Sequence, residues 1–292
     1  SVMDRILGNA QVGFKPVKWL DISLRVGTDV SSDKRKQIDS KRVIDPNGQN
    51  AGNNFAGRYS ETTINIREFT SDLIATAKRN LTKDLALSVL LGHNIRQRNI
   101  DNQFSQINSL TIPFYYNLAN SAQPPVSTNF YSIRRLYGVY SDINLSFRNY
   151  LFLGITGRND WSSTLPKGKN NFFYPSVNSS FVFSEALKMP KFISYGKIRA
   201  SAAQVGNDAA PYLLESVFIT GTVTDGQLNS QVNFPLNGIP GFTQGNIIGN
   251  PGIRPEITTS YEAGLELGLF NNRITFEGTI YSNRSKDQII TV

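Results

Sequence analysis

Two-residue alternation of apolar and polar side chains is the feature that most restricts how this chain folds. In the sharpest case, the residues Tyr261, Ala263, Leu265, Leu267 and Leu269 alternate with Ser260, Glu262, Gly264, Glu266 and Gly268. Successive side chains of a β-strand point to opposite faces, so this period predicts a strand with one apolar and one polar face. The same period recurs in Leu20–Val30, Leu85–Gly92 and Ile274–Tyr281.

Weaker alternation predicts six further strands. They are Ala10–Lys15, Phe69–Lys78, Tyr137–Leu145, Leu151–Asp160, Phe173–Ser184 and Tyr195–Val205. No segment has a helical period longer than about two turns, although a short helix is expected at Ser184–Met189. The sequence therefore predicts an all-β chain of about ten antiparallel strands.

The connections between these strands alternate between tight and long. The tight ones are Pro16–Trp19, Arg79–Asp84, Phe147–Tyr150 and Phe270–Arg273, and the long ones are Ser31–Arg58, Gln97–Asn129 and Gly206–Pro255. Such an order places all tight turns at one end of an up-and-down sheet, as in outer-membrane barrels. Aromatic residues adjoin the tight connections, as an interfacial girdle would: Trp19, Phe147, Tyr150, Phe192, Tyr195 and Phe270.

Strand length, loop asymmetry and the aromatic girdle together favour a transmembrane β-barrel over a soluble sandwich, which has the same period. About ten residues per strand suits a tilted crossing of the hydrocarbon layer. The apolar faces would then meet lipid, where a Lys or Arg at mid-depth costs about 2–4 kcal/mol. The candidate lumen-facing residues all lie on the opposite faces: Arg25, Arg158, Asp160, Arg199, Glu262 and Glu266.

Composition argues against catalysis, a metal or another cofactor. The 292 residues include no cysteine and one histidine, His93, and we expect that histidine to be interfacial or solvated. Asp45–Asn50 lacks the spacing of a calcium loop and predicts a turn, and the glycine-rich Gly238–Gly252 predicts a mobile loop. The net charge of +8 comes without a nucleic-acid-binding motif, so contact with anionic lipid head groups is the more specific interpretation. The sequence contains no run of 18 apolar residues, and we expect no signal peptide within its first residues, Ser1 to Gly8.

Three stretches of the sequence carry a family resemblance. They read GRNDWSSTLPKGKNNFFYPSVNSSFVFSEAL from Gly157, YGKIRASAAQVGN from Tyr195, and NPGIRPEITTSYEAGLELGLFNNRITFEGTIYSNRSKDQII from Asn250. In this order they resemble the SusC/RagA-type TonB-dependent transporters of the Bacteroidota outer membrane. The resemblance is strongest from Leu136 onward. Trp161 departs from it, because the family often has glycine there.

The resemblance implies a nutrient importer in the cell outer membrane. Members have a plug domain that contacts TonB and a barrel of about 22 strands, so residues 1–292 are expected to form part of a single barrel domain, with the plug outside this chain. Implied partners are a SusD-like surface lipoprotein, the TonB complex, outer-membrane lipid including lipopolysaccharide, and a glycan or peptide cargo. Nucleic acid is not among them.

Aromatic residues of the long connections are candidates for contact with cargo or with the lipoprotein, or for packing within the loops. The candidates are Tyr115, Tyr116, Tyr212, Phe218, Phe234 and Phe242. Two other functions remain open, namely a passive pore or structural barrel and a soluble glycan-binding β-domain. A membrane-embedded hydrolase is the weakest alternative, because acid–base residues are lacking.

Overall fold

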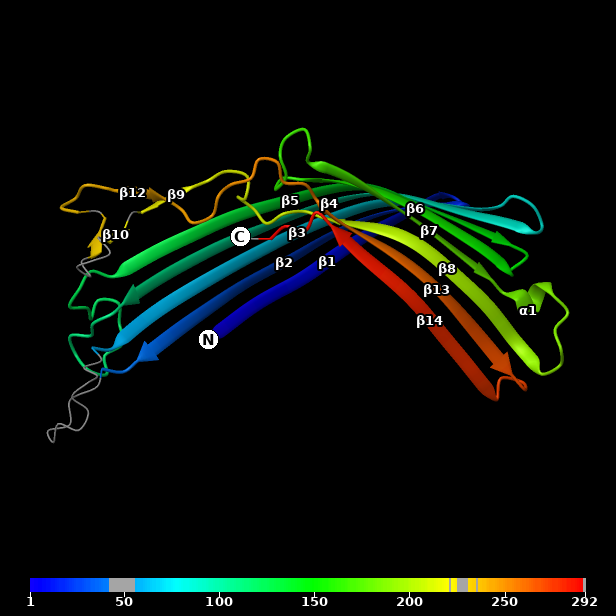
Figure 1. Ribbon diagram of the computed structural model, residues 1–292, viewed down its shortest axis with the longest axis horizontal. Helices are drawn as coiled ribbons and strands as arrows, with labels where there is room; N and C mark the ends of the chain where they lie inside the picture. Colours follow the sequence, from blue (N-terminus) through cyan, green and yellow to red (C-terminus); the bar gives the residue numbers. More distant parts are fainter. Residues whose placement is uncertain (42–55, 221, 225–230, 235, 291–292) are drawn as a thin grey trace. The chain divides into compact units, whose positions relative to one another are not determined.

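The computed structural model describes residues 1–41, 56–220, 222–224, 231–234 and 236–290 (Figure 1). Ten strands form one sheet in the order β1-β2-β3-β4-β5-β6-β7-β8-β13-β14, so sequence neighbours pair until the long connection after β8. This confirms the predicted all-β architecture with about ten strands. The turn expected at Asp45–Asn50 lies outside the described residues.

The strands of the large sheet have the following bounds: β1 Val2–Val17, β2 Leu20–Asp39, β3 Arg58–Asn80, β4 Leu85–Ile107, β5 Val126–Phe147, β6 Leu151–Ser162, β7 Asn171–Phe181, β8 Ile193–Asn207, β13 Glu256–Leu269 and β14 Ile274–Lys286. The connection between β8 and β13 contains four three-residue strands: β9 Phe218–Thr220, β10 Thr222–Thr224, β11 Gln231–Asn233 and β12 Phe242–Gln244. A single-turn helix, α1, spans Phe183–Ala186.

The chain divides into two compact units, which are described separately. Unit 1 comprises residues 1–11, 25–71 and 95–134, and unit 2 comprises residues 12–24, 72–94 and 135–292. A small loop core lies in each unit. In unit 1 it is Tyr59, Ile107 and Leu110 with Tyr116 and Leu118, and in unit 2 it is Leu165, Phe172, Ala209 and Ile253 with Tyr174, Leu213, Leu214 and Ile289.

The register of the strands in unit 2 confirms the alternation of faces. Leu265 lies opposite Ile198 and Gly278, whereas the next residue, Glu266, lies opposite Lys197 and Glu277. Because paired residues share a face of the sheet, the apolar positions of β8, β13 and β14 form one surface and the charged positions form the other. We call these surfaces the apolar face and the polar face.

The apolar face of unit 2 stays uncovered in the described part of the chain. Ile198 and Phe276 are about half exposed, at 48% and 54%. A soluble sandwich would bury such residues between two sheets. The buried apolar residues of unit 2 lie instead in its loop core and at Val182 beside α1.

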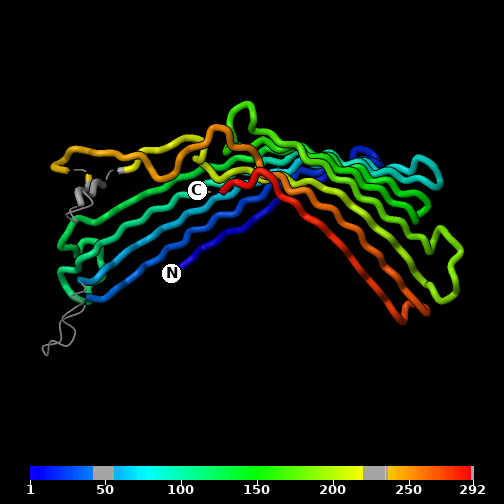
Figure 2. The backbone as a smooth tube through the Cα atoms, in the orientation of Figure 1, coloured from blue at the N-terminus to red at the C-terminus, as the bar shows by residue number. Residues whose placement is uncertain are grey.

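The tight turns carry the expected aromatic residues. Phe147 and Tyr150 lie 5.6 Å apart between ring centroids, and Phe192 lies 6.3 Å from Phe270 of the β13–β14 hairpin, which Figure 2 traces in orange and red. Arg148 and Asn149 both have positive φ, at 48° and 59°, as in the two-residue turns that match the twist of a hairpin.

Strand length differs from the expectation of about ten residues. β2, β3, β4 and β5 contain 20, 23, 23 and 22 residues, so the long connections after β2 and β4 are shorter than expected. In unit 1 the polar extensions are joined by ion pairs such as Arg58 with Asp39 at 2.5 Å and Arg96 with Glu68 at 2.8 Å. The strands therefore extend beyond the residues in which apolar and polar side chains alternate, so alternation did not predict their outer parts.

Two other boundaries differ from the expectation. β7 ends at Phe181 rather than Ser184, and the helix occupies Phe183–Ala186 rather than Ser184–Met189. Gly196 lies beneath the helix, because a Cβ there would be 2.1 Å from the Phe183 ring. Part of the expected loop Gly238–Gly252 forms β12, which pairs with β9.

Candidate functional site

The polar face of unit 2 carries a charged cluster on β8, β13 and β14. The Arg199 guanidinium lies 3.3 Å from Glu277, 3.7 Å from Glu262 and 3.9 Å from Glu266, and it donates a 2.8 Å hydrogen bond to Thr279 Oγ1. Three predicted residues, Arg199, Glu262 and Glu266, therefore lie together. The sequence analysis missed Lys197, whose Nζ lies 3.1 Å from Glu266, although its position two residues before Arg199 places it on the same face.

A glycine makes room for the Arg199 side chain. A Cβ at Gly264, which pairs with Arg199, would lie 2.5 Å from the Arg199 Nε atom. The guanidinium can thus lie across β13 and reach the carboxylates of two strands. The cluster adjoins a hollow of about 250 Å³ whose lining includes Asn178, Ser180 and Ser201.

A second network joins β5, β6 and β7 on the same polar face. Arg158 Nε donates to Asp160 Oδ1 at 2.8 Å, Tyr174 donates its hydroxyl to Asp160, and the Arg158 guanidinium lies 5.3 Å from the Tyr140 ring centroid. Asp160 is buried. Gly138 faces the pair closely, because a Cβ there would lie 2.2 Å from Asp160 Oδ1.

The residues after this pair form a buried hydroxyl–carboxylate network. Ser162 Oγ and Thr164 Oγ1 donate to Asp208 Oδ2 at 2.5 and 3.0 Å, and Ser162 Oγ also accepts from the Thr164 backbone N–H at 3.2 Å. This clamp ties the end of β6 to the first residue after β8. The sequence analysis missed Asp208, which comes directly after the resembling stretch that ends at Asn207 and belongs to no sequence motif.

The β8–β13 connection is also held where it enters β13. Glu256, the first residue of β13, accepts hydrogen bonds from Asn207 at 3.0 Å and from the Ile289 backbone N–H at 2.7 Å. Ile253 is buried in the loop core of unit 2. Both ends of this connection are therefore fixed to the sheet.

Arg25 lies in unit 1, apart from these networks in the sequence. Its guanidinium donates to Gln11 Oε1 on β1 at 3.3 and 3.4 Å. Asp29, on the same face of β2, pairs with Arg5 at 2.5 Å. The polar face of β2 in unit 1 is therefore held by bonds to β1.

The aromatic candidates divide into packed and exposed residues. Tyr116 packs on the loop core of unit 1 and its hydroxyl lies 2.9 Å from Ser40 Oγ, so the structure favours packing for this residue. Phe234 is partly buried and lies close to Gly241. Exposed side chains belong to Tyr115, Tyr212, Phe218 and Phe242.

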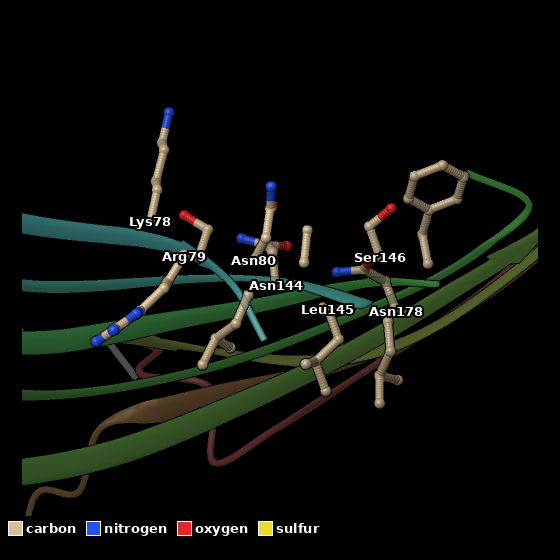
Figure 3. A pocket seen from close by; sticks show the side chains of 13 residues that line it. Lys78, Arg79, Asn80, Asn144, Leu145, Ser146 and Asn178 are labelled. Carbon is tan, nitrogen blue, oxygen red and sulfur yellow. The ribbon is translucent and has the colours of Figure 1, made fainter. Parts of the chain in front are cut away.

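A hollow of about 300 Å³ lies in unit 2 toward the tight-turn ends of β3 to β6 (Figure 3). Lys78 and Ser146 point to one side of the sheet, whereas Arg79 and Leu145 point to the other. Asn144, Phe152 and Asn178 also line it. The lining offers hydrogen-bonding groups around one aromatic ring.

The tight-turn end carries an exposed ion pair. Arg148 Nη2 lies 3.1 Å from Asp84 Oδ2, and the Arg148 backbone N–H donates to the Asp84 carbonyl at 2.8 Å. The hydrogen bond that Arg148 donates to the Asp84 carboxylate raises the pKa of Arg148 above its ordinary value. The pair links the β5–β6 turn to the β3–β4 turn.

His93 lies among aromatic residues in unit 2. Its ring centroid is 4.6 Å from that of Tyr137, and Tyr137 lies 5.2 Å from Trp161. Tyr137 and Trp161 are paired residues of β5 and β6 on the apolar face. This aromatic row lies in the middle of β4 and β5 and at the long-loop end of β6, and it is the counterpart of the aromatic residues at the tight turns.

Within the described residues, no helix is long and apolar enough to span a bilayer, and no group of three or more His, Cys, Asp or Glu side chains is arranged to hold a metal ion.

Comparison with known proteins places these features in a family. The model of the TonB-dependent receptor-like β-barrel matches residues 10–292. TonB-dependent receptor P26 of Formosa agariphila is 24% identical over 99% of this chain and 28% of its own length, and receptor P3 of the same organism is 24% identical over 80% and 23%. This chain therefore spans less than a third of these relatives.

Solved structures have the same fold. The RagAB peptide transporter superposes with a TM-score of 0.82 at 17% identity, covering 99% of this chain and 31% of that one. The siderophore receptor PiuA from Acinetobacter baumannii gives 0.52 at 13% identity, covering 96% and 40%.

These matches confirm the SusC/RagA-type resemblance seen in the sequence motifs and the fold of a partial barrel. The family is one of receptors and transporters, not an enzyme class. The chain belongs to the TonB-dependent receptor-like β-barrel family.

Proposed function

We propose that this chain is part of the barrel wall of an outer-membrane importer that takes up a bulky nutrient, a glycan or an oligopeptide, with energy delivered through TonB. The observation that carries the proposal is the two-faced sheet of unit 2, whose apolar face is exposed and whose polar face holds the Arg199 cluster and the Arg158–Asp160 pair. Family membership supports TonB-dependent uptake. Residues 1–292 would belong to a single barrel domain.

In this proposal the apolar face meets lipid and the polar face meets the lumen. Arg158, Asp160, Arg199, Glu262 and Glu266 would be lumen-facing, as would Arg25 in unit 1. Ionic side chains there are hydrated or paired, whereas on the lipid face each would cost about 2–4 kcal/mol at mid-depth. Lipopolysaccharide would contact the outer surface near the aromatic row.

A SusD-like surface lipoprotein is proposed as the second component, in line with the two-part name RagAB of the structural neighbour. The exposed aromatic residues of the long connections, Tyr115, Tyr212, Phe218 and Phe242, would contact this lipoprotein or the cargo. The name of that neighbour, a peptide transporter, supports an oligopeptide as one cargo class.

The orientation is tested with cysteine pairs in the full-length protein, in a background without other cysteines. Leu265→Cys and Glu266→Cys are adjacent on β13 and lie on opposite faces. We expect a lipid-confined thiol reagent to label position 265 and a water-soluble reagent to label position 266. Equal labelling of both positions by the water-soluble reagent would contradict the proposal.

Uptake is tested in cells that carry the full-length gene. Deleting TonB should abolish growth on the cargo while leaving the protein in the outer membrane. Growth that persists without TonB would favour a passive pore. The measurement is growth rate on a single glycan or peptide source, with glucose as the control.

A further inference from the structure

The tight connections of the sheet carry most of the net positive charge of the chain. They are residues 16–19, 79–84, 147–150, 185–194 and 270–273. Their basic residues are Lys18, Arg79, Lys83, Arg148, Lys188, Lys191 and Arg273, and their acidic residues are Asp84 and Glu185. The tight connections therefore have a net charge of +5, whereas the whole chain, which is far longer, has +8.

Backbone hydrogen bonds join these connections along one edge of unit 2. The carbonyls of Trp19, Asp84, Tyr150 and Phe192 accept from the N–H groups of Lys78, Arg148, Val182 and Phe270, respectively, at 2.7 to 2.8 Å. All of these residues belong to unit 2. The basic residues of separate connections therefore lie along one continuous edge. We call the five tight connections together the basic rim.

The basic side chains of the rim are exposed, and most of them have no acidic partner. Arg148 pairs with Asp84 at 3.1 Å. In the part of the chain that the structure describes, the other six basic residues of the rim form no ion pair. On the polar face, in contrast, Lys197 and Arg199 both pair with glutamates. The positive charge of the rim is thus available to an anionic partner outside unit 2.

The rim borders the apolar face of unit 2. On that face, Phe147 is paired with Leu151, and Leu151 with Phe181. The Tyr150 ring lies 5.6 Å from the Phe147 ring and 6.1 Å from the Phe181 ring, between centroids. The Arg148 guanidinium lies 5.3 Å from the Phe147 ring centroid. Aromatic rings and positive groups meet in the same way at the surface of a bilayer, at the level of the lipid head groups.

Two adjacent residues beside the turn between β3 and β4 distinguish the two sides of the rim. Figure 3 shows Arg79 on the side of Leu145 and Lys78 on the side of Ser146. The register of β5 to β8 places Leu145 on the apolar face and Ser146 on the polar face. A lipid head group would therefore meet Arg79, whereas a partner inside the barrel would meet Lys78.

We propose that the basic rim binds the anionic head groups of phospholipids in the inner leaflet of the outer membrane. This inference rests on the barrel wall of the proposed function, because the tight turns of such barrels lie at the periplasmic surface. Charge complementarity favours this partner, since Lys and Arg near a membrane surface attract anionic lipids. A row of separate basic side chains also suits lipids, because each head group needs only one or two of them and no enclosed pocket.

The test uses the full-length protein in vesicles with equal amounts of phosphatidylcholine and phosphatidylglycerol. Phospholipids that stay bound after extraction in a mild detergent are quantified by mass spectrometry. We expect phosphatidylglycerol to be bound in about fivefold excess, the preference that one basic residue gives near an anionic surface. In about 1 M salt the excess should disappear, because charges are then screened within about 3 Å.

The triple variant Lys18→Gln/Arg79→Gln/Lys191→Gln removes one positive charge from each of three connections of the rim. All three side chains are exposed. We expect the ratio of bound phosphatidylglycerol to phosphatidylcholine to fall by about two- to threefold, since the other basic residues of the rim remain.

The matched control, Lys78→Gln/Lys167→Gln/Lys169→Gln, removes the same charge elsewhere. Lys78 points to the polar side, and the other two are exposed in the connection between β6 and β7 at the opposite end of these strands. The control should keep the ratio of the unmodified protein. An equal fall in both triple variants would overturn the inference. So would the lack of any excess in the unmodified protein, or an excess that persists in high salt. If the rim variant does not assemble, as judged by its heat-dependent shift on a gel, the salt dependence of the unmodified protein decides.

A photo-crosslinking residue at position 81 in cells identifies the partner directly. Leu81 is an exposed residue of the rim, between Arg79 and Lys83, so both charges are kept. A crosslink to phospholipid supports the inference, and a crosslink to another protein or to another part of the same protein overturns it. If the cysteine pair at positions 265 and 266 shows no lipid-facing side, the barrel wall itself fails. If that pair labels as expected and phosphatidylglycerol is not preferred, only the basic rim fails.

Discussion

Asp208 offers a direct test of the clamp that joins the end of β6 to the β8–β13 connection. Its Oδ2 atom accepts from Ser162 at 2.5 Å and from Thr164 at 3.0 Å, and all three side chains are buried. Asp208→Ala would leave two buried hydroxyl donors without this acceptor.

The expected magnitude follows from these contacts. A hydrogen bond to a charged group contributes about 1.5–3 kcal/mol, so two of them contribute about 3–6 kcal/mol. Part of this is recovered, because Ser162 Oγ and Thr164 Oγ1 lie 2.8 Å apart and can still bond to each other, and because a buried carboxylate is no longer desolvated. We expect a net loss of about 2–3 kcal/mol in the local stability of the clamp.

Hydrogen exchange on the full-length protein measures this loss. The Ser162 N–H donates to the Asn170 carbonyl at 2.9 Å and the Thr164 N–H to Ser162 Oγ, so both amides report opening of the clamp. A loss of 2–3 kcal/mol corresponds to exchange about 30- to 150-fold faster. Glu215→Ala, at an exposed position of the same connection, is the control. Exchange within about threefold of the unmodified protein would refute the reasoning.

Three further variants test other parts of the structure. Gly138→Ala would displace the Arg158–Asp160 pair and should lower the stability of the protein by about 1–3 kcal/mol, measured as a lower midpoint temperature of the heat-dependent gel shift. The control Gly8→Ala should leave this temperature unchanged, because no atom lies within 4 Å of a Cβ at Gly8. Arg199→Leu removes the ion pairs to Glu262, Glu266 and Glu277 and leaves these carboxylates close to one another, so we expect a lower midpoint temperature of the heat-dependent gel shift, and a milder effect from Arg199→Lys, which keeps the charge. A midpoint temperature equal to that of the unmodified protein would contradict this. Tyr116→Ala should lower the stability of the loop core of unit 1 by about 2–4 kcal/mol and speed proteolysis of residues 108–125. The control is Tyr115→Ala, at the exposed neighbouring position. Equal cleavage rates in the two variants would show that Tyr116 does not pack in the loop core.

The faces of the sheet could be predicted from the sequence because side-chain alternation is set by backbone geometry alone. Leu265 and Glu266 fall on opposite faces whatever the neighbouring strands are. Tight turns were also predictable, because Phe147–Tyr150 and Phe270–Arg273 interrupt two apolar periods directly. The outer halves of β2 to β5 were missed, because their pairing relies on backbone bonds and ion pairs such as Arg58 with Asp39.

The contacts within the site were less predictable than its faces. Arg158 and Asp160 share a face by spacing, but their direct pairing depends on the space left by Gly138, one strand away. Asp208 was missed because its partners, Ser162 and Thr164, lie more than forty residues earlier in the chain. Such long-range polar contacts leave no local period in the sequence.

The fixed base of the β8–β13 connection has an evolutionary consequence. Asp208, Glu256 and Ile253 anchor both ends of this connection, and none of these anchors belongs to the short strands β9, β10, β11 and β12 between them. Folding of the wall is therefore insulated from substitutions between the anchors. The sequence between the anchors can therefore vary while the contacts that hold the strands in place remain.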